Sequence, residues 1–264
     1  MCLIALAWRS HPRYELALIA NRDEFHARPA AAAATDPAHP DLHGGRDLVQ
    51  GGSWLQVSTR GRLAAVTNVR AGVPDGAGLR SRGALVRDFA SGTSTAAEFA
   101  AALAATAAGY GRFNLLLWDG GALRFAGNHP GFVTHAVAPG VHAMSNGEFD
   151  ARWPKSTRAT AALSSWLGSS AGGTGPGDAP LPLAPLFEAL TDTTPAAEAL
   201  LPDTGVGLEL ERALSPPFVR GPRYGTRCSS VVLIAADTIT FAERRFGPDA
   251  APAGESTAIL PRPA

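Results

Sequence analysis

Short apolar runs separated by turn residues occupy both ends of this chain, and they constrain its fold more than any other feature. Residues 2–8 and 15–20 are two such runs, joined by a polar turn that contains Pro12. Two runs of this length on either side of a short turn predict a β-hairpin. The chain closes with a similar pair at 227–235 and 238–244. The sequence therefore predicts sheets that use both ends of the chain.

The middle of the chain has helical periodicity. Residues 80–90, 94–108 and 154–168 predict helices, and Leu183 begins a fourth apolar stripe at helical spacing. The segment 26–45 is rich in Ala, Pro and His without a period, so we expect an excursion over the surface. Further short strands are expected at 53–58, 63–69, 112–118, 122–126, 132–135 and 141–144.

Strands at both ends and helices between them predict an α+β or layered α/β fold, because the sheet faces need helices to cover them. At 264 residues the chain is long enough for one large domain. We expect that domain at 1–247, followed by a flexible Pro/Ala-rich tail at 248–264. The Gly, Ser and Pro-rich stretch 169–180 is expected to be a flexible connector.

Charge and composition exclude several classes of protein. The 23 Lys and Arg residues balance the 23 Asp and Glu residues, which argues against non-specific nucleic-acid binding because that needs a basic face. No apolar stretch reaches the length of a membrane span, and the N-terminal run is too short for a signal peptide. Two cysteines, Cys2 and Cys228, are too few for a secreted disulfide framework. We expect a cytoplasmic protein, and the sequence leaves its oligomeric state open.

Cys2 stands directly behind the initiator methionine. If Met1 is removed, Cys2 carries a thiol and a free α-amine on one carbon. An α-amine has a pKa of about 7.7–8.0 and can take the thiol proton without a separate histidine. The alternative is a small, half-buried apolar residue at the start of a strand.

A polar block ends the second apolar run, at Asn21, Arg22, Asp23 and Glu24. In a hairpin, the end of the second strand lies beside the start of the first, where Cys2 is. The block therefore either surrounds Cys2 or forms a solvated loop.

Several collinear segments together resemble the NRDE family, also called the transport-and-Golgi-organisation protein 2 family, of the N-terminal-nucleophile (Ntn) hydrolase-like superfamily. The resemblance runs in order from residue 2 to residue 245. It rests on Cys2, Asn21–Phe25, Arg28-Pro29, Gly51–Leu55, Ser58–Asn68, Arg82–Val86, Phe113–Leu115, Ser145-Asn146, Tyr224–Arg227 and a closing hairpin from Val231 to Glu243.

The resemblance implies a fold and an activity. The fold is the four-layer αββα sandwich of Ntn hydrolases, with the nucleophile at the start of the first strand. The activity is hydrolysis of non-peptide linear amides, or acyl transfer, by a mature protein that begins at Cys2. The residues that match the site are Cys2, Asn21, Arg22, Asp23, Glu24, Asn68, Asn146 and Arg227.

Roles for the two asparagines follow from amide chemistry. Asn68 and Asn146 each close an expected strand, and they look like the asparagines that choloylglycine-type Ntn hydrolases place around the nucleophile. A neutral amide N–H can donate to the oxyanion of a tetrahedral intermediate. The alternative is that each asparagine only completes a turn.

The charged residues have roles around the thiol. Arg22 beside Cys2 is expected to lower the thiol pKa, and Asp23 or Glu24 to hold the α-amine. Arg227 is expected to serve the same thiolate or a substrate carboxylate. Choloylglycine hydrolases have an Arg-Asn-x-Asp order where this chain has Asn-Arg-Asp-Glu, so their geometry does not transfer directly.

A second function stays open, that of a non-catalytic carrier of haem or acyl-lipid ligands on the same fold. Its partner is an amphipathic small molecule whose carboxylates face Arg22 and Arg227. The chain has no motif for covalent haem attachment, so haem is expected as a transported ligand and not as a cofactor. His39 and His43 lack a third candidate ligand, which argues against a metal site.

Overall fold

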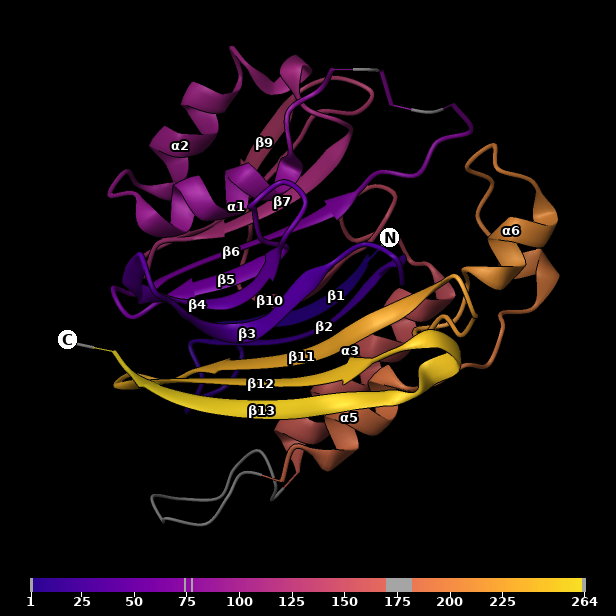
Figure 1. Cartoon of the computed structure of the whole chain (residues 1–264). Coiled ribbons are helices and arrows are strands. Elements are labelled where there is room, and N and C mark those ends of the chain that lie inside the picture. Colours follow the sequence, from indigo (N-terminus) through magenta and orange to yellow (C-terminus); the bar gives the residue numbers. More distant parts are fainter. Residues whose placement is uncertain (1, 74, 77, 170–181, 263–264) are drawn as a thin grey trace.

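The computed structural model describes residues 2–73, 75–76, 78–169 and 182–262, which form two antiparallel sheets packed face to face between two layers of helices (Figure 1). One sheet has six strands and joins the two ends of the chain. Its order is β10 (Gly140–Met144), β1 (Cys2–Trp8), β2 (Leu16–Phe25), β11 (Tyr224–Ile234), β12 (Thr238–Phe246) and β13 (Pro252–Pro261).

The other sheet has seven strands in sequence order, each paired with the next. It is a meander of hairpins, so short turns connect most of its strands. Its strands are β3 (Ala30–Asp36), β4 (His39–Asp47), β5 (Leu55–Ser58), β6 (Arg62–Asn68), β7 (Phe113–Trp118), β8 (Leu123–Gly127) and β9 (Val133–Ala136).

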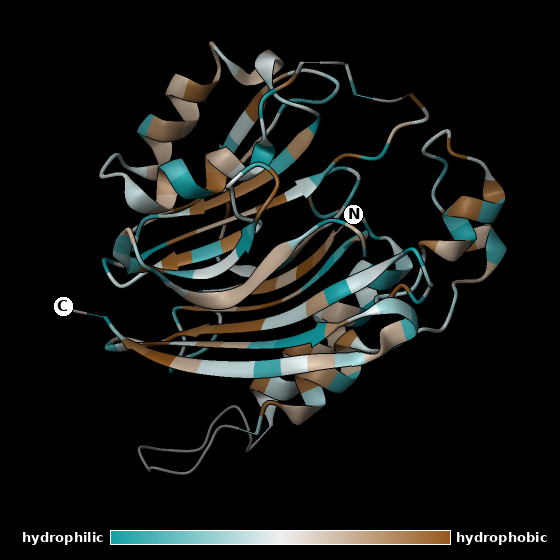
Figure 2. Ribbon diagram, in the orientation of Figure 1, coloured by the Kyte–Doolittle hydropathy of each residue, from teal (hydrophilic) through white to brown (hydrophobic). Residues whose placement is uncertain are grey.

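Successive side chains of β1 are buried in two different hydrophobic cores, one on each face of the strand. Ile4 and Leu6 are buried in the core between the two sheets. Leu3 and Ala5 are buried in a second core beneath the helices. Side chains alternate between the two faces of a strand, so β1, which is covered on both faces, is apolar from Leu3 to Trp8. Figure 2 shows hydrophobic stretches along the strands of both sheets, with polar residues between them.

Helices cover the outer face of each sheet (Figure 1). Leu85, Val86 and Phe89 of α1 pack on the seven-stranded sheet, while Leu163 and Trp166 of α3 pack on the six-stranded sheet. The fold is therefore α+β and is the predicted four-layer αββα sandwich. The helices are α1 (Arg82–Ser91), α2 (Ala96–Leu103), α3 (Pro154–Gly168), α5 (Ala184–Leu190) and α6 (Leu208–Ala213), with short 3₁₀ turns at Ala107–Gly109, Glu198–Leu200 and Pro248–Ala250.

Two segments differ from the sequence prediction. The expected surface excursion at 26–45 contains β3 and most of β4, and the expected flexible tail contains β13, which pairs with β12. Backbone pairing with a neighbouring strand organises both segments although their side chains have little periodicity. The expected connector at 169–180 lies almost wholly outside the described residues.

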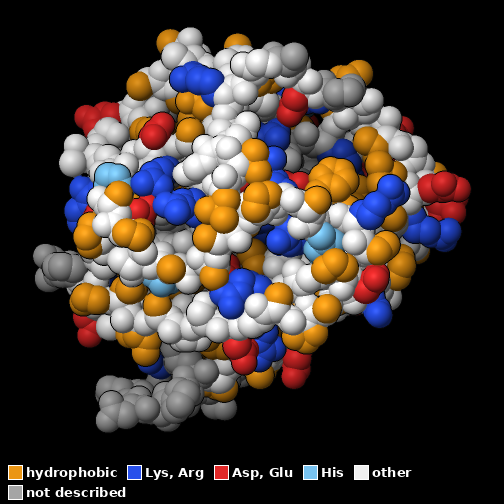
Figure 3. Space-filling model, viewed as in Figure 1, with side chains coloured by type: hydrophobic (Ala, Val, Ile, Leu, Met, Phe, Trp, Pro, Cys, Tyr) orange, Lys and Arg blue, Asp and Glu red, His pale blue; other side chains and the backbone are white. Residues whose placement is uncertain are grey.

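Charge is mixed on the face shown in Figure 3, where positive, negative and hydrophobic side chains are interspersed. Within the described residues, no helix is both long enough and apolar enough to cross a membrane.

Candidate active site

Cys2 is the first residue of β1, at the end of a strand that runs through the middle of the molecule. Its backbone carbonyl accepts a hydrogen bond of 2.9 Å from Ser145 Oγ, in the loop after β10. Cys2 is in phase with Ile4 and Leu6, so its side chain is on the face of β1 that looks toward the other sheet. The fold therefore places the start of the chain at the junction of the two sheets.

A pocket of about 290 Å³ opens at this junction. It receives side chains from both sheets and from the start of α1. Its lining residues are Cys2, Arg22, Asp23, Glu24, Arg28, Asp47, Gln50, Ser53, Trp54, Val66, Asn68, Ser81, Arg82 and Gly83. We call it the Cys2 pocket.

Arg22 lies directly opposite Cys2 in the pairing of β1 with β2. Its guanidinium stacks on the ring of Trp54 at 4.3 Å, and Trp54 precedes β5 of the other sheet. Its Nη2 lies 3.8 Å from Oε2 of Glu24, which in turn lies 4.0 Å from Nε of Arg28. Arg22 and Glu24 thus share the pocket side of β2.

Asn21 points the other way, toward the helix layer. Its Nδ2 donates to the carbonyl oxygens of Leu190 and Pro217 at 2.7 and 2.8 Å. Its Oδ1 accepts from Ser229 Oγ at 2.6 Å. The structure therefore gives Asn21 three hydrogen bonds outside the Cys2 pocket, where it ties β2 to α5 and β11.

Asp23 is buried beside the start of β1. Its Oδ1 accepts a hydrogen bond of 2.6 Å from Thr226 Oγ1, and the carboxyl contributes to the wall of the Cys2 pocket. Burial raises the pKa of Asp23, and the charge of Lys155 opposes that rise.

The two asparagines differ in their surroundings. Asn68 ends β6 and lines the Cys2 pocket, and its side-chain amide has no hydrogen-bond partner among the described residues. Asn146 is fully buried, and its Nδ2 donates to the carbonyl of Asn68 at 2.8 Å. Asn68 is thus available to a ligand, whereas Asn146 holds the backbone that presents it.

Lys155 is a site residue that our sequence reasoning missed. It lies in the first turn of α3, is 2% exposed, and donates from Nζ to Oδ1 of Asn146 at 3.2 Å. Burial lowers the pKa of Lys155 to about 8, and the negative charges of Asp23 and Cys2 oppose that shift. Its one signal in the sequence is that it is the only lysine.

The Cys2 thiol does not have the lowered pKa that its neighbour Arg22 led us to expect. Burial raises the pKa of Cys2, the negative charge of Asp23 raises it further, and the positive charge of Arg22 lowers it by less. Desolvation outweighs the arginine because the thiolate loses its water. The thiol therefore needs a base to become a nucleophile.

Arg227 does not line the Cys2 pocket. Its Nη1 donates to the carbonyl oxygens of Phe25 and Arg28 at 2.9 and 3.0 Å. It lines instead an adjoining pocket that contains Cys228, on the other side of Arg22. We call this the Cys228 pocket.

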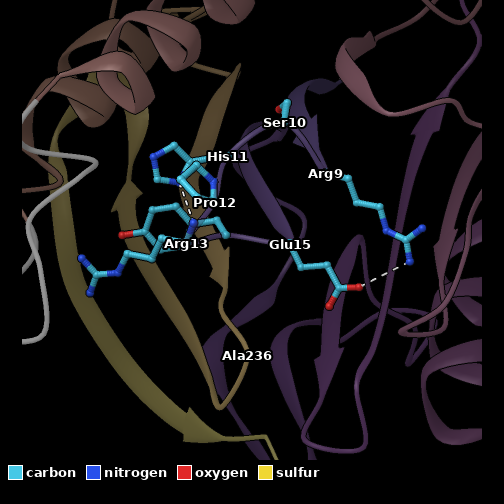
Figure 4. Close-up of a pocket in the computed structure, with 8 residues that line it drawn as sticks. Arg9, Ser10, His11, Pro12, Arg13, Glu15 and Ala236 are labelled. Carbon is cyan, nitrogen blue, oxygen red and sulfur yellow. Dashed lines mark hydrogen bonds and ion pairs between the residues drawn. The ribbon is translucent and has the colours of Figure 1, made fainter.

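A larger hollow of about 550 Å³ lies at the opposite end of β1, around the turn to β2 (Figure 4). It is lined by Arg9, His11, Arg13 and Glu15 among others, with Arg9 paired to Glu15 at 3.9 Å. Seven residues of extended strand place it about 20 Å from Cys2. It receives none of the site residues predicted from the sequence.

Neither of the two histidines considered for metal binding lines the Cys2 pocket. His39 is exposed at the start of β4, and His43 is buried with its ring 5.2 Å from that of Phe241. Among the described residues there is no cluster of three His, Cys, Asp or Glu side chains that could hold a metal.

Comparisons with known proteins agree with this architecture. The family model described as Transport and Golgi organisation 2 matches residues 1–248. The Transport and Golgi organization protein 2 homologs of Bos taurus and Homo sapiens are 33% and 30% identical, and each alignment covers 92% of both chains.

A solved structure, the Caenorhabditis elegans N-acylethanolamine-hydrolyzing acid amidase ortholog, matches with a TM-score of 0.52 at 10% identity. The match covers 88% of this chain and 92% of that one. At this identity the likeness shows a shared fold, that of the Ntn hydrolases.

Proposed function

This chain belongs to the Transport and Golgi organisation 2 family, and on that premise we propose that it cleaves linear amides with the thiol of Cys2 after removal of Met1. The observation that carries the proposal is the Cys2 pocket, which brings a thiol at the start of an interior strand together with Asn68. A nucleophile and a neutral N–H donor at one cavity are what acyl transfer requires.

The α-amine of Cys2 supplies the base. It takes the thiol proton as sulfur attacks the carbonyl carbon of the amide, and the carbonyl oxygen becomes an oxyanion that accepts from Asn68 Nδ2. When the tetrahedral intermediate collapses, the C–N bond breaks and the ammonium returns its proton to the leaving amine. Water, deprotonated by the α-amine, then attacks the thioester and releases a carboxylic acid, restoring the thiol.

Buried groups behind the pocket hold this geometry. Lys155 donates to Asn146, and Asn146 donates to the carbonyl of Asn68. Ser145 holds the carbonyl of Cys2. These bonds connect the helix layer to both sheets, so a shift of α3 would move the donor relative to the nucleophile. In this proposal Asp23 faces the protonated α-amine and balances its charge.

The fold likeness favours a linear amide as the substrate, and the pocket size is compatible with one end of such a molecule. The solved neighbour is named for hydrolysis of N-acylethanolamines, which are linear fatty amides. A pocket of about 290 Å³ is at the small end of ligand sites, which run from about 300 to 1,000 Å³. That volume suits one end of a linear amide better than the broad macrocycle of haem, so we place the carrier function second.

The carrier function keeps one observation in its favour, namely that the thiol pKa is raised and not lowered. A carrier needs no activated thiol. If haem or an acyl lipid is carried on this fold, its carboxylates would face Arg22 and Arg227, and Cys2→Ala would leave its affinity unchanged.

Trapping the covalent intermediate separates the two functions. The mature protein is mixed with an N-acylethanolamine, quenched in acid within a turnover, and its peptides are weighed by mass spectrometry. We expect an acyl group on the peptide that begins at Cys2 and none on the peptide that contains Cys228. Release of fatty acid without an acyl group on Cys2 would reject the mechanism, and no release from a panel of linear amides would favour the carrier.

A further inference from the structure

The Cys228 pocket adjoins the Cys2 pocket across the side chain of Arg22. It has a volume of about 230 Å³ and lies where β3 of one sheet faces β11 and β12 of the other. Arg22 and Trp54 line both pockets. The two stacked side chains therefore border both pockets, and a ligand in one pocket lies next to the other.

The Cys228 pocket has an excess of positive charge. Arg22, Arg227 and Arg245 line it, against one carboxyl, Glu243. Glu243 is 1% exposed, and its Oε1 accepts from the backbone N–H of Ala33 at 2.9 Å. The same oxygen lies 3.7 Å from Nη1 of Arg245. Arg22 also lies 3.8 Å from Glu24, which is outside this pocket. The three guanidinium groups thus have two carboxyls near them, and the pocket keeps a net positive charge.

Two guanidinium N–H groups at this pocket are buried without a partner. Nη1 of Arg22 and Nε of Arg227 make no hydrogen bond within the described residues. A buried polar group left unpaired is destabilising, and more so when it is charged. The pKa of Arg227 is lowered by burial and by the nearby charge of Arg22. A negatively charged ligand in the pocket would lie beside both side chains.

The remaining lining is apolar. Ala30, Ala31 and Ala32 of β3 and Phe246 at the end of β12 complete the pocket. Small apolar side chains beside guanidinium groups favour an anion that ends a hydrocarbon chain over a free inorganic ion. Arginine binds a carboxylate with two parallel hydrogen bonds, which matches this charge pattern.

The strand register gives the distance between the two pockets. Cys2 and Cys228 both pair with Arg22, one from each neighbouring strand. They are therefore two strand spacings apart, about 10 Å. That distance equals about three residues of extended chain.

We propose that the Cys228 pocket binds a carboxylate of the substrate, and that linear amides with a carboxylate about 10 Å from the scissile carbonyl are better substrates than neutral ones such as N-acylethanolamines. The assignment of a substrate class rests on the proposed amide cleavage. The pocket itself is defined by Arg22, Arg227 and Arg245 and can be tested by binding alone.

Calorimetry on the Cys2→Ala protein tests it without turnover. The probe is the mono-N-methylamide of an eight-carbon dicarboxylic acid, and its neutral partner is the bis-N-methylamide of the same acid. We expect the charged probe to bind about tenfold or more tightly than the neutral one, the scale of a charge-assisted hydrogen bond. Inorganic phosphate, with charge but no chain, should bind more weakly than the charged probe.

Two adjacent arginines provide a matched control. Arg245 lines the Cys228 pocket, whereas Arg244 is on the other face of β12, 3.1 Å from Glu255. Arg245→Gln should reduce the preference for the charged probe, because it removes one of the three positive charges at the pocket, and Arg244→Gln should keep it. Equal affinity for the two probes, equal effects of the two substitutions, phosphate binding as tight as the probe, or no saturable binding would overturn the proposal. Binding of the charged probe without its hydrolysis by mature unmodified protein would support the pocket and reject amide cleavage.

Discussion

The two thiols of this protein lie on either side of one arginine, yet their surroundings differ. Cys2 and Cys228 both pair with Arg22, and burial raises the pKa of each. Cys2 begins a strand and shares its pocket with Asn68. Cys228 is inside β11 beside Glu243, whose negative charge raises its pKa further.

The comparison shows what an arginine can and cannot do for a thiol. The positive charge of Arg22 acts on both sulfurs, and neither thiol pKa is lowered as a result. In the proposed mechanism, a base and an oxyanion donor distinguish the two sites instead. Only Cys2 can acquire an α-amine on its own residue, and Cys228 is held in the chain between two peptide bonds. Under the proposed mechanism, the position in the chain therefore decides which thiol can react.

Removing each sulfur in turn gives the largest expected difference. Cys2→Ala should reduce hydrolysis of an N-acylethanolamine to the uncatalysed level, a loss on the order of 10⁴-fold or more, because the covalent step is gone. Cys228→Ala should keep the turnover of the folded protein within a few-fold. Fatty-acid release by the two variants checks this, and similar losses in both would contradict the assignment of Cys2 as nucleophile.

Asn68 is the next test, because it distinguishes the Cys2 pocket from the Cys228 pocket. Asn68→Ala should lower kcat by about 10²–10³, the usual cost of one oxyanion donor. Thermal stability should change little, since the side-chain amide has no hydrogen-bond partner in the part of the chain that the structure describes. Gln56, a buried amide on β5, offers a control, and Gln56→Ala should cost stability more than turnover. Unchanged kcat in Asn68→Ala would remove it from the mechanism.

Lys155 predicts the pH dependence of the Cys2 site. Its pKa of about 8 lies below the usual value for lysine, so its charge is present below pH 8 and is lost as the pH rises through that value. The α-amine must be deprotonated to act as base, with a pKa of about 7.7–8.0. We therefore expect a bell-shaped profile with its maximum near pH 8 and a fall of about tenfold per unit on the alkaline side.

Substitution at Lys155 separates this positioning role from a purely structural one. Lys155→Arg keeps a charge that does not titrate in this range, so the alkaline limb should disappear while activity at pH 7 is partly retained. Lys155→Met should be weakly active at every pH. An alkaline limb that persists in both variants would assign it to another group.

The smallest expected effect concerns stability. Cys228 is 3% exposed in the core of the six-stranded sheet, so Cys228→Ala should lower the free energy of unfolding by about 1 kcal/mol. Cys2 is partly exposed, and Cys2→Ala should change that free energy by less. Urea unfolding of both variants measures this, and a larger loss for Cys2→Ala would mean that Cys2 has a structural role.

Sequence patterns predicted many helices and strands of this fold, because these elements depend on periodicity, whereas the four-layer arrangement followed from the family resemblance. The helix predicted at 154–168 matches α3, and the strands predicted at 112–118 and 141–144 match β7 and β10 closely. In contrast, β3 and β13 were missed. Each is an edge strand whose order comes from backbone pairing with one neighbour, and such pairing leaves little trace in the side chains.

In the site, too, some contacts could be predicted from the sequence and others could not. The hairpin placed Arg22 beside Cys2, because register follows from two runs and a turn. The sequence did not separate Asn21 from Arg22, which are on opposite faces of β2. It also gave Lys155 no role, because its contact with Asn146 joins a helix to a loop. Side-chain contacts between layers depend on how the layers pack, and packing cannot be predicted from the pattern of a single sequence.

The state of the N-terminus tests the central claim most directly. The same protein is prepared in two forms, one that begins at Cys2 and one that retains Met1, with intact mass confirming each. In the second form the α-amine of Cys2 is an amide nitrogen and cannot act as a base. We predict amide hydrolysis by the form that begins at Cys2 and a loss of at least about 10²-fold in the other, the typical contribution of general-base catalysis. Equal hydrolysis by the two forms would contradict the account.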